Sequence, residues 1–151
     1  MPAKCELPGL RFQYPENWSL GDEMHESEND SVTVYSPSGA FWSVARYPSS
    51  ADPAALARAA VEAMRQEYDS LEAHETRETI AGHDLVGYDL FFYCLDMTNT
   101  AQVRAASMQG ATYVVFQQAE DRDFEGVGLV FRAMSTSLFR EMEERRRQLP
   151  P

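Results

Sequence analysis

Residues 83–95 have the sequence HDLVGYDLFFYCL, and this stretch decides the fold. In an extended chain successive side chains point to opposite faces, so the apolar residues of this stretch fall on both faces of a strand. The first face would carry Val86, Tyr88, Leu90, Phe92 and Cys94, and the second would carry Leu85, Phe91, Tyr93 and Leu95. A strand with water on one side alternates apolar and polar residues. We therefore expect a central strand, with helices or loops over both faces of its sheet.

Further strand-like segments flank this stretch, and short turns separate them. The turns include Ala81-Gly82, Gly110 and the Ser-Pro-Ser-Gly sequence at 36–39, which suits a hairpin loop. Short turns join antiparallel neighbours. The sequence thus predicts an antiparallel sheet of about six strands, from segments at residues 10–14, 32–35, 41–47, 75–80 leading through the turn into 83–95, 100–108 and 111–119.

Two other segments have apolar residues at steps of three and four, which is typical of amphipathic helices. The first begins after Asp52, because this side chain can cap free N–H groups while Pro53 suits the first helical position. We expect it to run from Pro53 to about Glu72. Its buried stripe would be Ala57, Ala60, Val61, Met64, Tyr68 and Leu71. The second helix would start between Asp121 and Asp123 and bury Phe124, Val127, Val130, Phe131, Met134, Leu138 and Met142.

These elements predict an α+β fold in which long helices pack on both faces of the sheet. Gly126 and Gly128 lie in the first turns of the second helix and cost about 1 kcal/mol each relative to alanine. Either the helix starts irregularly, or these glycines permit close packing on the sheet. We expect a single domain over residues 1–151, with mobile ends at residues 1–9 and 144–151.

Composition limits the classes of partner. The 151 residues include 44% hydrophobic ones, enough for one core, and 13 basic against 24 acidic residues give a net charge of −11. Such a charge repels phosphate backbones and anionic lipid, so we expect no nucleic-acid and no membrane partner. No apolar run approaches the roughly 18 residues of a membrane span. Cys5 and Cys94 are the two cysteines, a sparse count that favours a cytoplasmic protein over a trimmed secreted one.

One polar stretch concentrates ligand-capable side chains. It contains Asp22, Glu23, His25, Glu26, Glu28 and Asp30. The stretch lacks the alternating acidic residues, central glycine and closing glutamate of a calcium loop, so we expect no metal site there. A solvated loop is the plainest interpretation. Because loops often carry function, the same residues are the candidate protein-binding surface.

No catalytic motif is present in the sequence. His25, His74 and His83 stand far apart, and the glycine-rich phosphate loops, the nucleophile elbow and the zinc-protease motif are all missing. Asp89 interrupts an apolar strand; if Leu95 opposes Thr100, Arg104 would lie diagonally across from it. We expect a structural ion pair there, no catalytic residue, no cofactor and no enzymatic activity.

Short motifs along the chain resemble a known superfamily. They are F-x-Y-P-x-x-W at residues 12–18, I-A-G-H at 80–83, T-Y-V-V-F at 112–116, D-F-E at 123–125 and S-L-F at 137–139. This order resembles the superfamily of the PsbP extrinsic proteins of photosystem II, the Mog-type Ran-binding factors and the bacterial DcrB-like proteins. The resemblance implies an α-β-α sandwich that binds or assembles other proteins without an active site. An evident lumenal or lipoprotein signal is missing, which argues against a role in photosynthesis.

Three hypotheses of function follow. The first is a non-catalytic protein-interaction or assembly module. The second is a small-ligand protein with an apolar pocket between the sheet and a helix, lined by Tyr88, Phe92 and Met134. The third and weakest is a hydrolase or isomerase that uses Asp89 or a histidine.

Overall fold

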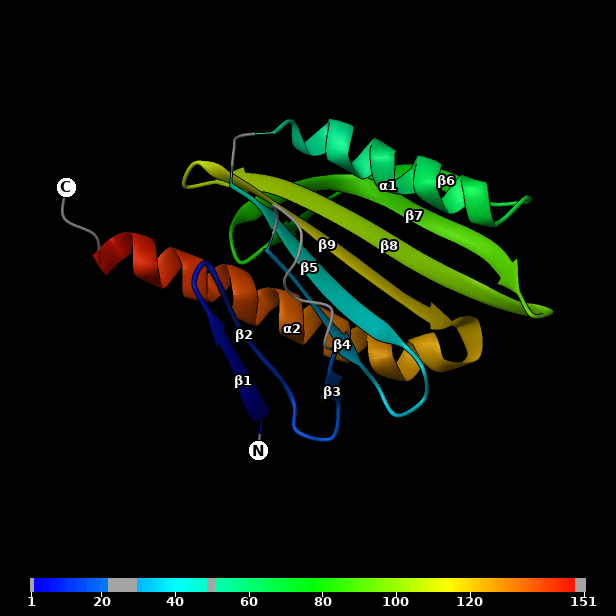
Figure 1. Ribbon diagram of the computed structural model, residues 1–151, viewed down its shortest axis with the longest axis horizontal. Coiled ribbons are helices and arrows are strands. Elements are labelled where there is room, and N and C mark those ends of the chain that lie inside the picture. Colours follow the sequence, from blue (N-terminus) through cyan, green and yellow to red (C-terminus); the bar gives the residue numbers. More distant parts are fainter. Residues whose placement is uncertain (1, 22–29, 49–50, 149–151) are drawn as a thin grey trace.

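A computed structural model describes residues 2–21, 30–48 and 51–148. Within them, a seven-stranded antiparallel sheet has the order β3-β4-β5-β9-β8-β7-β6, and β1 and β2 form a separate hairpin (Figure 1). The strands are β1 (Pro2–Leu7), β2 (Leu10–Pro15), β3 (Ser19–Leu20), β4 (Asp30–Tyr35), β5 (Phe41–Tyr47), β6 (Glu72–Ile80), β7 (His83–Cys94), β8 (Met97–Met108) and β9 (Ala111–Glu120). The helices are α1 (Pro53–Glu67) and α2 (Asp121–Gln148).

Tight turns set the register of β6 to β9. Each of the loops 81–82, 95–96 and 109–110 has two residues with positive φ, from 51° at Ala81 to 82° at Gly82. Two such residues in a two-residue loop make a type I′ turn, whose twist matches that of the flanking strands. The four strands consequently form a meander in which each neighbour is also the next strand in sequence.

The residues of α2 contribute to one of two apolar clusters. Phe131, Leu138 and Phe139 of α2 are fully buried against Trp42 of β5 and against side chains of β2, β4 and β9. The Trp42 indole also donates a hydrogen bond to Ser135 Oγ at 2.9 Å. This bond satisfies the polar end of an otherwise buried ring, and it links α2 to β5.

The second cluster belongs to α1. Ala57, Val61 and Met64 of α1 pack with Leu90 of β7 and Val103 of β8. Successive residues of β9 pack in different clusters. Val114 packs against the α1 cluster, and Val115 belongs to the α2 cluster. In Figure 1, α1 lies over β7 and β8, and α2 lies beside β2.

The first predicted helix starts where expected and ends early. Asp52 Oδ1 accepts a hydrogen bond from Ala54 N–H and Pro53 opens the helix, as predicted. The predicted end at Glu72 is wrong, because Tyr68 adopts extended backbone and Glu72 already starts β6. Leu71 is still buried, in the connection rather than in the helix.

The sheet and the chain ends also differ from expectation. The main sheet has seven strands where about six were predicted. Ser19–Leu20 is an additional short edge strand, and the segment predicted at 10–14 pairs with β1 in the separate hairpin. Regular structure extends into both ends that were predicted to be mobile: Pro2–Leu7 form β1, and α2 continues to Gln148. Cys5, expected in a mobile end, is buried in the α2 cluster.

Helices or loops were expected over both faces of β7, but they do not cover the end of that strand. Phe91 is 40% exposed, Tyr93 65% and Leu95 92%. These residues lie next to the edge strand β6 and at the loop that follows β7, while α2 packs mainly on β2, β9 and β8. Apolar content alone therefore gave the wrong burial for this end of the strand.

Gly126 provides a first stability prediction. The helix is regular from Asp121, and a Cβ at Gly126 would meet no atom within 4 Å. Because Gly126 is exposed and helical, Gly126→Ala is expected to raise the free energy of unfolding by about 0.5–1 kcal/mol. Urea denaturation of the variant and the wild type measures this difference. A loss of stability would mean that this turn of α2 needs glycine.

Candidate functional site

An apolar hollow of about 620 Å³ lies between the end of β2 and the middle of α2. Its apolar lining comes from the two chain segments 2–15 and 129–134. The residues are Pro2, Tyr14, Pro15, Leu129, Val130, Ala133 and Met134. We refer to this hollow as the β2–α2 groove. Its volume falls within the range of about 300–1,000 Å³ that is typical of ligand pockets.

Hydrogen bonds hold the two walls of the groove together. Gln13 N–H on β2 donates to Ser137 Oγ at 2.9 Å, and this hydroxyl donates to the Met134 carbonyl at 2.8 Å. At the end of β2, Trp18 N–H bonds to the Pro15 carbonyl at 3.0 Å and closes a turn. The Trp18 ring then packs edge-on against Phe131, with centroids 5.9 Å apart. The groove is thus bounded by β2, which is hydrogen-bonded to α2, and by a helix whose inner face is buried.

The floor and the rim of the groove differ in exposure. Met134 is 1% exposed and belongs to the core, whereas Leu129 is 75% exposed. Ala133 is also exposed and lies one helical turn after Leu129, so the two form an apolar strip along the rim. Gln13 and Asn17 supply polar groups at the border. This arrangement suits the binding of apolar groups from outside.

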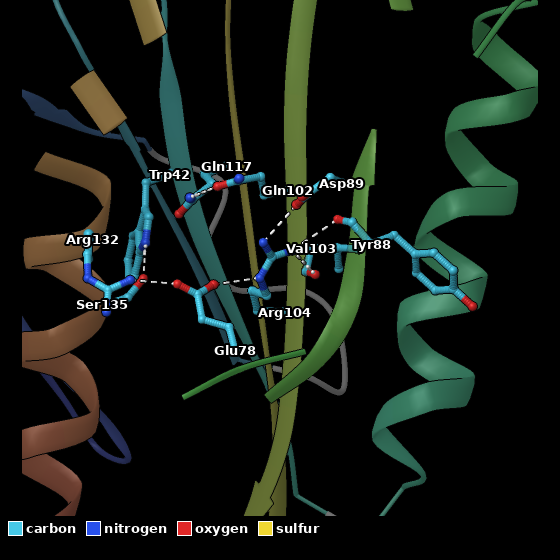
Figure 2. A network of polar contacts seen from close by, with 10 residues as sticks. All are labelled: Trp42, Glu78, Tyr88, Asp89, Gln102, Val103, Arg104, Gln117, Arg132 and Ser135. Carbon is cyan, nitrogen blue, oxygen red and sulfur yellow. Dashed lines mark hydrogen bonds and ion pairs between the residues drawn. The ribbon is translucent and has the colours of Figure 1, made fainter. Parts of the chain in front are cut away.

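A second arrangement of polar groups surrounds Arg104 on β8 (Figure 2). Arg104 Nε donates to Glu78 Oε1 at 2.7 Å and Nη2 donates to Asp89 Oδ1 at 2.7 Å. Its Nη1 donates to the carbonyls of Tyr88 and Val103, each at 3.1 Å. The Arg104 side chain is 8% exposed, and all three nitrogens of its guanidinium have partners.

Glu78 connects this arginine to α2. Its other oxygen accepts a hydrogen bond from Arg132 Nη1 at 2.7 Å, so one carboxylate on β6 joins β8 to the helix. A hollow of about 230 Å³ adjoins the network, and beside it Gln117 donates to Gln102 at 2.6 Å. The paired charges connect β6, β7, β8 and α2 through side-chain hydrogen bonds.

The predicted ion pair of Asp89 with Arg104 is confirmed, although the register from which it was predicted is wrong. Asp89 pairs with Arg104, as expected. Residues 95–96 form the loop, however, so Thr100 faces Phe91 instead of Leu95. Arg104 remains diagonal to Asp89 because Gln102 is the residue directly opposite. Both registers place the ion pair on the same face, since they differ by an even number of residues.

The pocket predicted from Tyr88, Phe92 and Met134 is not formed. Phe92 is buried in the α1 cluster, with Tyr88 beside it, whereas Met134 is buried in the α2 cluster. Tyr88 and Phe92 project from one face of β7, and strand periodicity alone does not tell which helix covers that face. Of the three residues, Met134 lines the β2–α2 groove.

The acidic stretch lies mostly outside the described residues, which exclude positions 22–29. Asp30 is described; it begins β4, and its carboxylate lies 3.9 Å from Arg46 Nη1. Among the described residues, no group of three His, Cys, Asp or Glu side chains is placed to hold a metal.

The described histidines and cysteines lie outside the groove lining. His74 is exposed near Glu72, and His83 Nε2 lies 3.3 Å from Glu143 without hydrogen-bond geometry. Burial raises the pKa of the Cys5 thiol, which lowers its reactivity. None of the helices between residues 53 and 148 is both long and apolar enough to cross a membrane.

The sequence prediction missed the groove because its walls are more than 100 residues apart. Leu129 gave one signal, since it is an apolar residue outside the predicted buried stripe of α2. Such a residue is commonplace on a surface, and its meaning depends on the neighbouring strand β2.

Comparison with known proteins identifies the fold. No protein-family model matches the sequence, and no curated protein matches it either. Among solved structures, the solution structure of cyanobacterial PsbP (CyanoP) from Synechocystis sp. PCC 6803 superposes with a TM-score of 0.61. It is 12% identical, and the alignment covers 91% of this chain and 89% of CyanoP. The fold is PsbP-like.

Two further bacterial proteins superpose on this chain with different scores. A Bacteroides thetaiotaomicron protein superposes with a TM-score of 0.60 and 14% identity over 89% of this chain. The chain spans about half, 46%, of the length of that protein. A Pseudomonas aeruginosa protein of unknown function has a TM-score of 0.48 at 13% identity, and the alignment covers 99% of this chain and 96% of that one. At such identities the likeness to CyanoP and the Bacteroides protein concerns the fold alone.

Proposed function

We propose that this chain is a non-catalytic protein-interaction module, and that its β2–α2 groove receives an apolar segment of a partner protein. The observation that carries the proposal is the 75% exposure of Leu129 on the rim of an apolar hollow. An exposed leucine beside such a hollow becomes buried when a partner fills it. The floor residue is Met134, and methionine is a residue type that fits apolar groups of different shape.

The proposed architecture is an α-β-α sandwich. Val114 and Val115 are successive residues of β9, and they pack in the α1 and α2 clusters respectively. Because successive strand residues point to opposite faces, this supports one helix on each face. The groove would then lie on the α2 side, with the hairpin β1–β2 as its outer wall.

The residues of the groove favour binding over catalysis. Among the described residues its lining is mostly apolar, with Glu16 as the one acidic group and no histidine or cysteine. A catalytic site brings several titratable groups together, and the described part of the lining does not do so. The acidic stretch from Asp22 to Asp30 stays a prediction for a second contact with the same partner, and the net charge of −11 suits a basic one.

A second candidate function uses the same groove. Its volume of about 620 Å³ also fits a small apolar ligand, which would rest on Met134. Such a ligand would fill the floor and leave the strip of Leu129 and Ala133 largely in water. Burial of that strip therefore distinguishes a protein segment from a small ligand.

Leu129→Asp provides the test. A charge on the rim is expected to weaken partner binding at least about tenfold, because the carboxylate must lose water when the segment docks. Folding should be unaffected, since residue 129 is on the surface. The matched control is Leu95→Asp, which changes another exposed leucine, in the loop after β7. Quantitative affinity purification from source-cell lysate, followed by titration with the purified partner, measures the loss.

Equal partner binding by wild type, Leu129→Asp and Leu95→Asp would contradict the proposal. Native mass spectrometry of the purified wild type addresses the second candidate. A bound small apolar molecule that Leu129→Asp still retains would favour the ligand-binding function instead.

A further inference from the structure

β6 is the last strand of the seven-stranded sheet, so one of its edges has no neighbouring strand in the described part of the chain. It is nine residues long, with the sequence EAHETRETI, and it contains no proline. Its side chains are exposed or half-buried from Glu72 to Thr79. A long open edge of this kind can pair with another strand unless its side chains prevent it.

The hairpin with β7 determines which backbone groups of β6 point outward. Ile80 pairs with His83 across the two-residue turn, so these residues exchange hydrogen bonds. Alternate residues then repeat the pattern, and the even-numbered residues of β6 bond to β7. The N–H and C=O groups of Ala73, Glu75, Arg77 and Thr79 therefore point away from the sheet. Among the described contacts, none satisfies these groups.

The charges on this edge complement a second copy in one register. If two β6 strands pair antiparallel about Thr76, Glu75 of each copy faces Arg77 of the other. His74 likewise faces Glu78, and the outward groups of 73, 75, 77 and 79 meet to form about eight hydrogen bonds. Opposite charges that face each other across strands contribute roughly 0.2–1 kcal/mol per pair.

Neighbouring registers lack this complementarity. Pairing about residue 75 would place Glu75 against Glu75, and pairing about residue 77 would place Arg77 against Arg77, both of which are like-charge contacts. Pairing about residue 74 or about residue 78 would not place Glu75 opposite Arg77, so these registers lack the attractive pair. Registers that join an odd residue to an even one are excluded, because their backbone groups point in opposite directions.

We propose that two copies of this chain form a symmetric dimer by antiparallel pairing of their β6 strands about Thr76. The sheet then continues from one subunit into the other. The interface is isologous, as expected for a twofold dimer, because each Glu75–Arg77 pair occurs twice. The β2–α2 groove takes no part in this interface, since Pro2, Tyr14 and Leu129 line it and β6 does not.

Charge exchange tests the register. Sedimentation equilibrium of the full chain should show a dimer for the wild type. Arg77→Glu is expected to weaken dimerisation at least about tenfold, because two attractive pairs become repulsive. Glu75→Arg should do the same, whereas the double variant Glu75→Arg/Arg77→Glu should recover the dimer. Both residues are exposed, so the folded state should be retained, which circular dichroism checks.

Disulfide trapping gives a second, independent readout. In the proposed dimer, Thr76 of one subunit lies opposite Thr76 of the other, in a pair without backbone hydrogen bonds. The two Cα atoms of such a pair are about 4.5 Å apart, which is within the range that a disulfide bridges. Thr76→Cys should therefore form a covalent dimer under mild oxidation. Thr79→Cys, which would face Ala73, and the wild type with its own two cysteines should not. A monomeric wild type, or a dimer that is insensitive to both charge variants, would overturn the proposal.

Discussion

Arg104→Ala is expected to lower the free energy of unfolding by about 3 kcal/mol, because it removes the cation of a largely buried network. The change leaves Asp89 without a described ion-pair partner, and Glu78 keeps just the bond from Arg132. It also takes the donors from the carbonyls of Tyr88 and Val103. We place the effect at the low end of the usual 3–5 kcal/mol, because Glu78 and Asp89 remain 27% and 30% exposed and water can reach them.

Arg132→Ala is the matched control for this effect. It removes another arginine from the same carboxylate, but its side chain is 59% exposed. Exposed ion pairs contribute at most about 1 kcal/mol, so the control should change stability little. Urea denaturation at neutral pH measures both variants. Similar losses for Arg104→Ala and Arg132→Ala would mean that the network is solvated and that its central arginine has no special role.

Gly87→Ala is expected to destabilise the fold by about 3 kcal/mol, the upper end for overpacking a filled interior. Gly87 is buried in β7, and a Cβ there would collide with the backbone carbonyl of Val103 on β8. A backbone atom cannot rotate away as a side chain can, so the two strands would have to separate. The ion pair of Asp89 with Arg104 lies beside this point and would also be disturbed.

The opposite sign is expected for Gly126→Ala, where the added methyl meets open space in a helix. The two glycine variants can be compared by urea denaturation in one series. If Gly87→Ala leaves the free energy of unfolding unchanged, the close approach of β7 to Val103 is not a constraint on the fold.

Much of the fold could be predicted from local patterns. Asp52-Pro53 marks the start of α1, and the Ala81-Gly82 turn marks the hairpin that joins β6 to β7. Both depend on residues that are adjacent in sequence. The register at Leu95 was not predictable in this way, because a leucine with φ of 52° in an exposed turn is unusual and has no residue-type signal.

Features that depend on distant segments could not be predicted. Phe91 and Tyr93 looked like core residues, and their exposure follows from the position of α2, which packs mainly away from that end of β7. The β2–α2 groove likewise needs Tyr14 and Leu129 to meet across the fold. The order of strands in the sheet and the direction of a helix set such meetings, and neither has a short motif.

Site-specific photo-cross-linking tests the proposed binding site most directly. A photoreactive phenylalanine analogue is placed at Ala133, on the rim of the groove, and in a matched variant at Ala59, another exposed helical alanine, in α1. The account predicts a cross-link to a distinct partner protein from position 133, its loss with Leu129→Asp, and no such product from position 59. Equal cross-linking from positions 59 and 133, or a product that survives Leu129→Asp, would contradict binding in the β2–α2 groove.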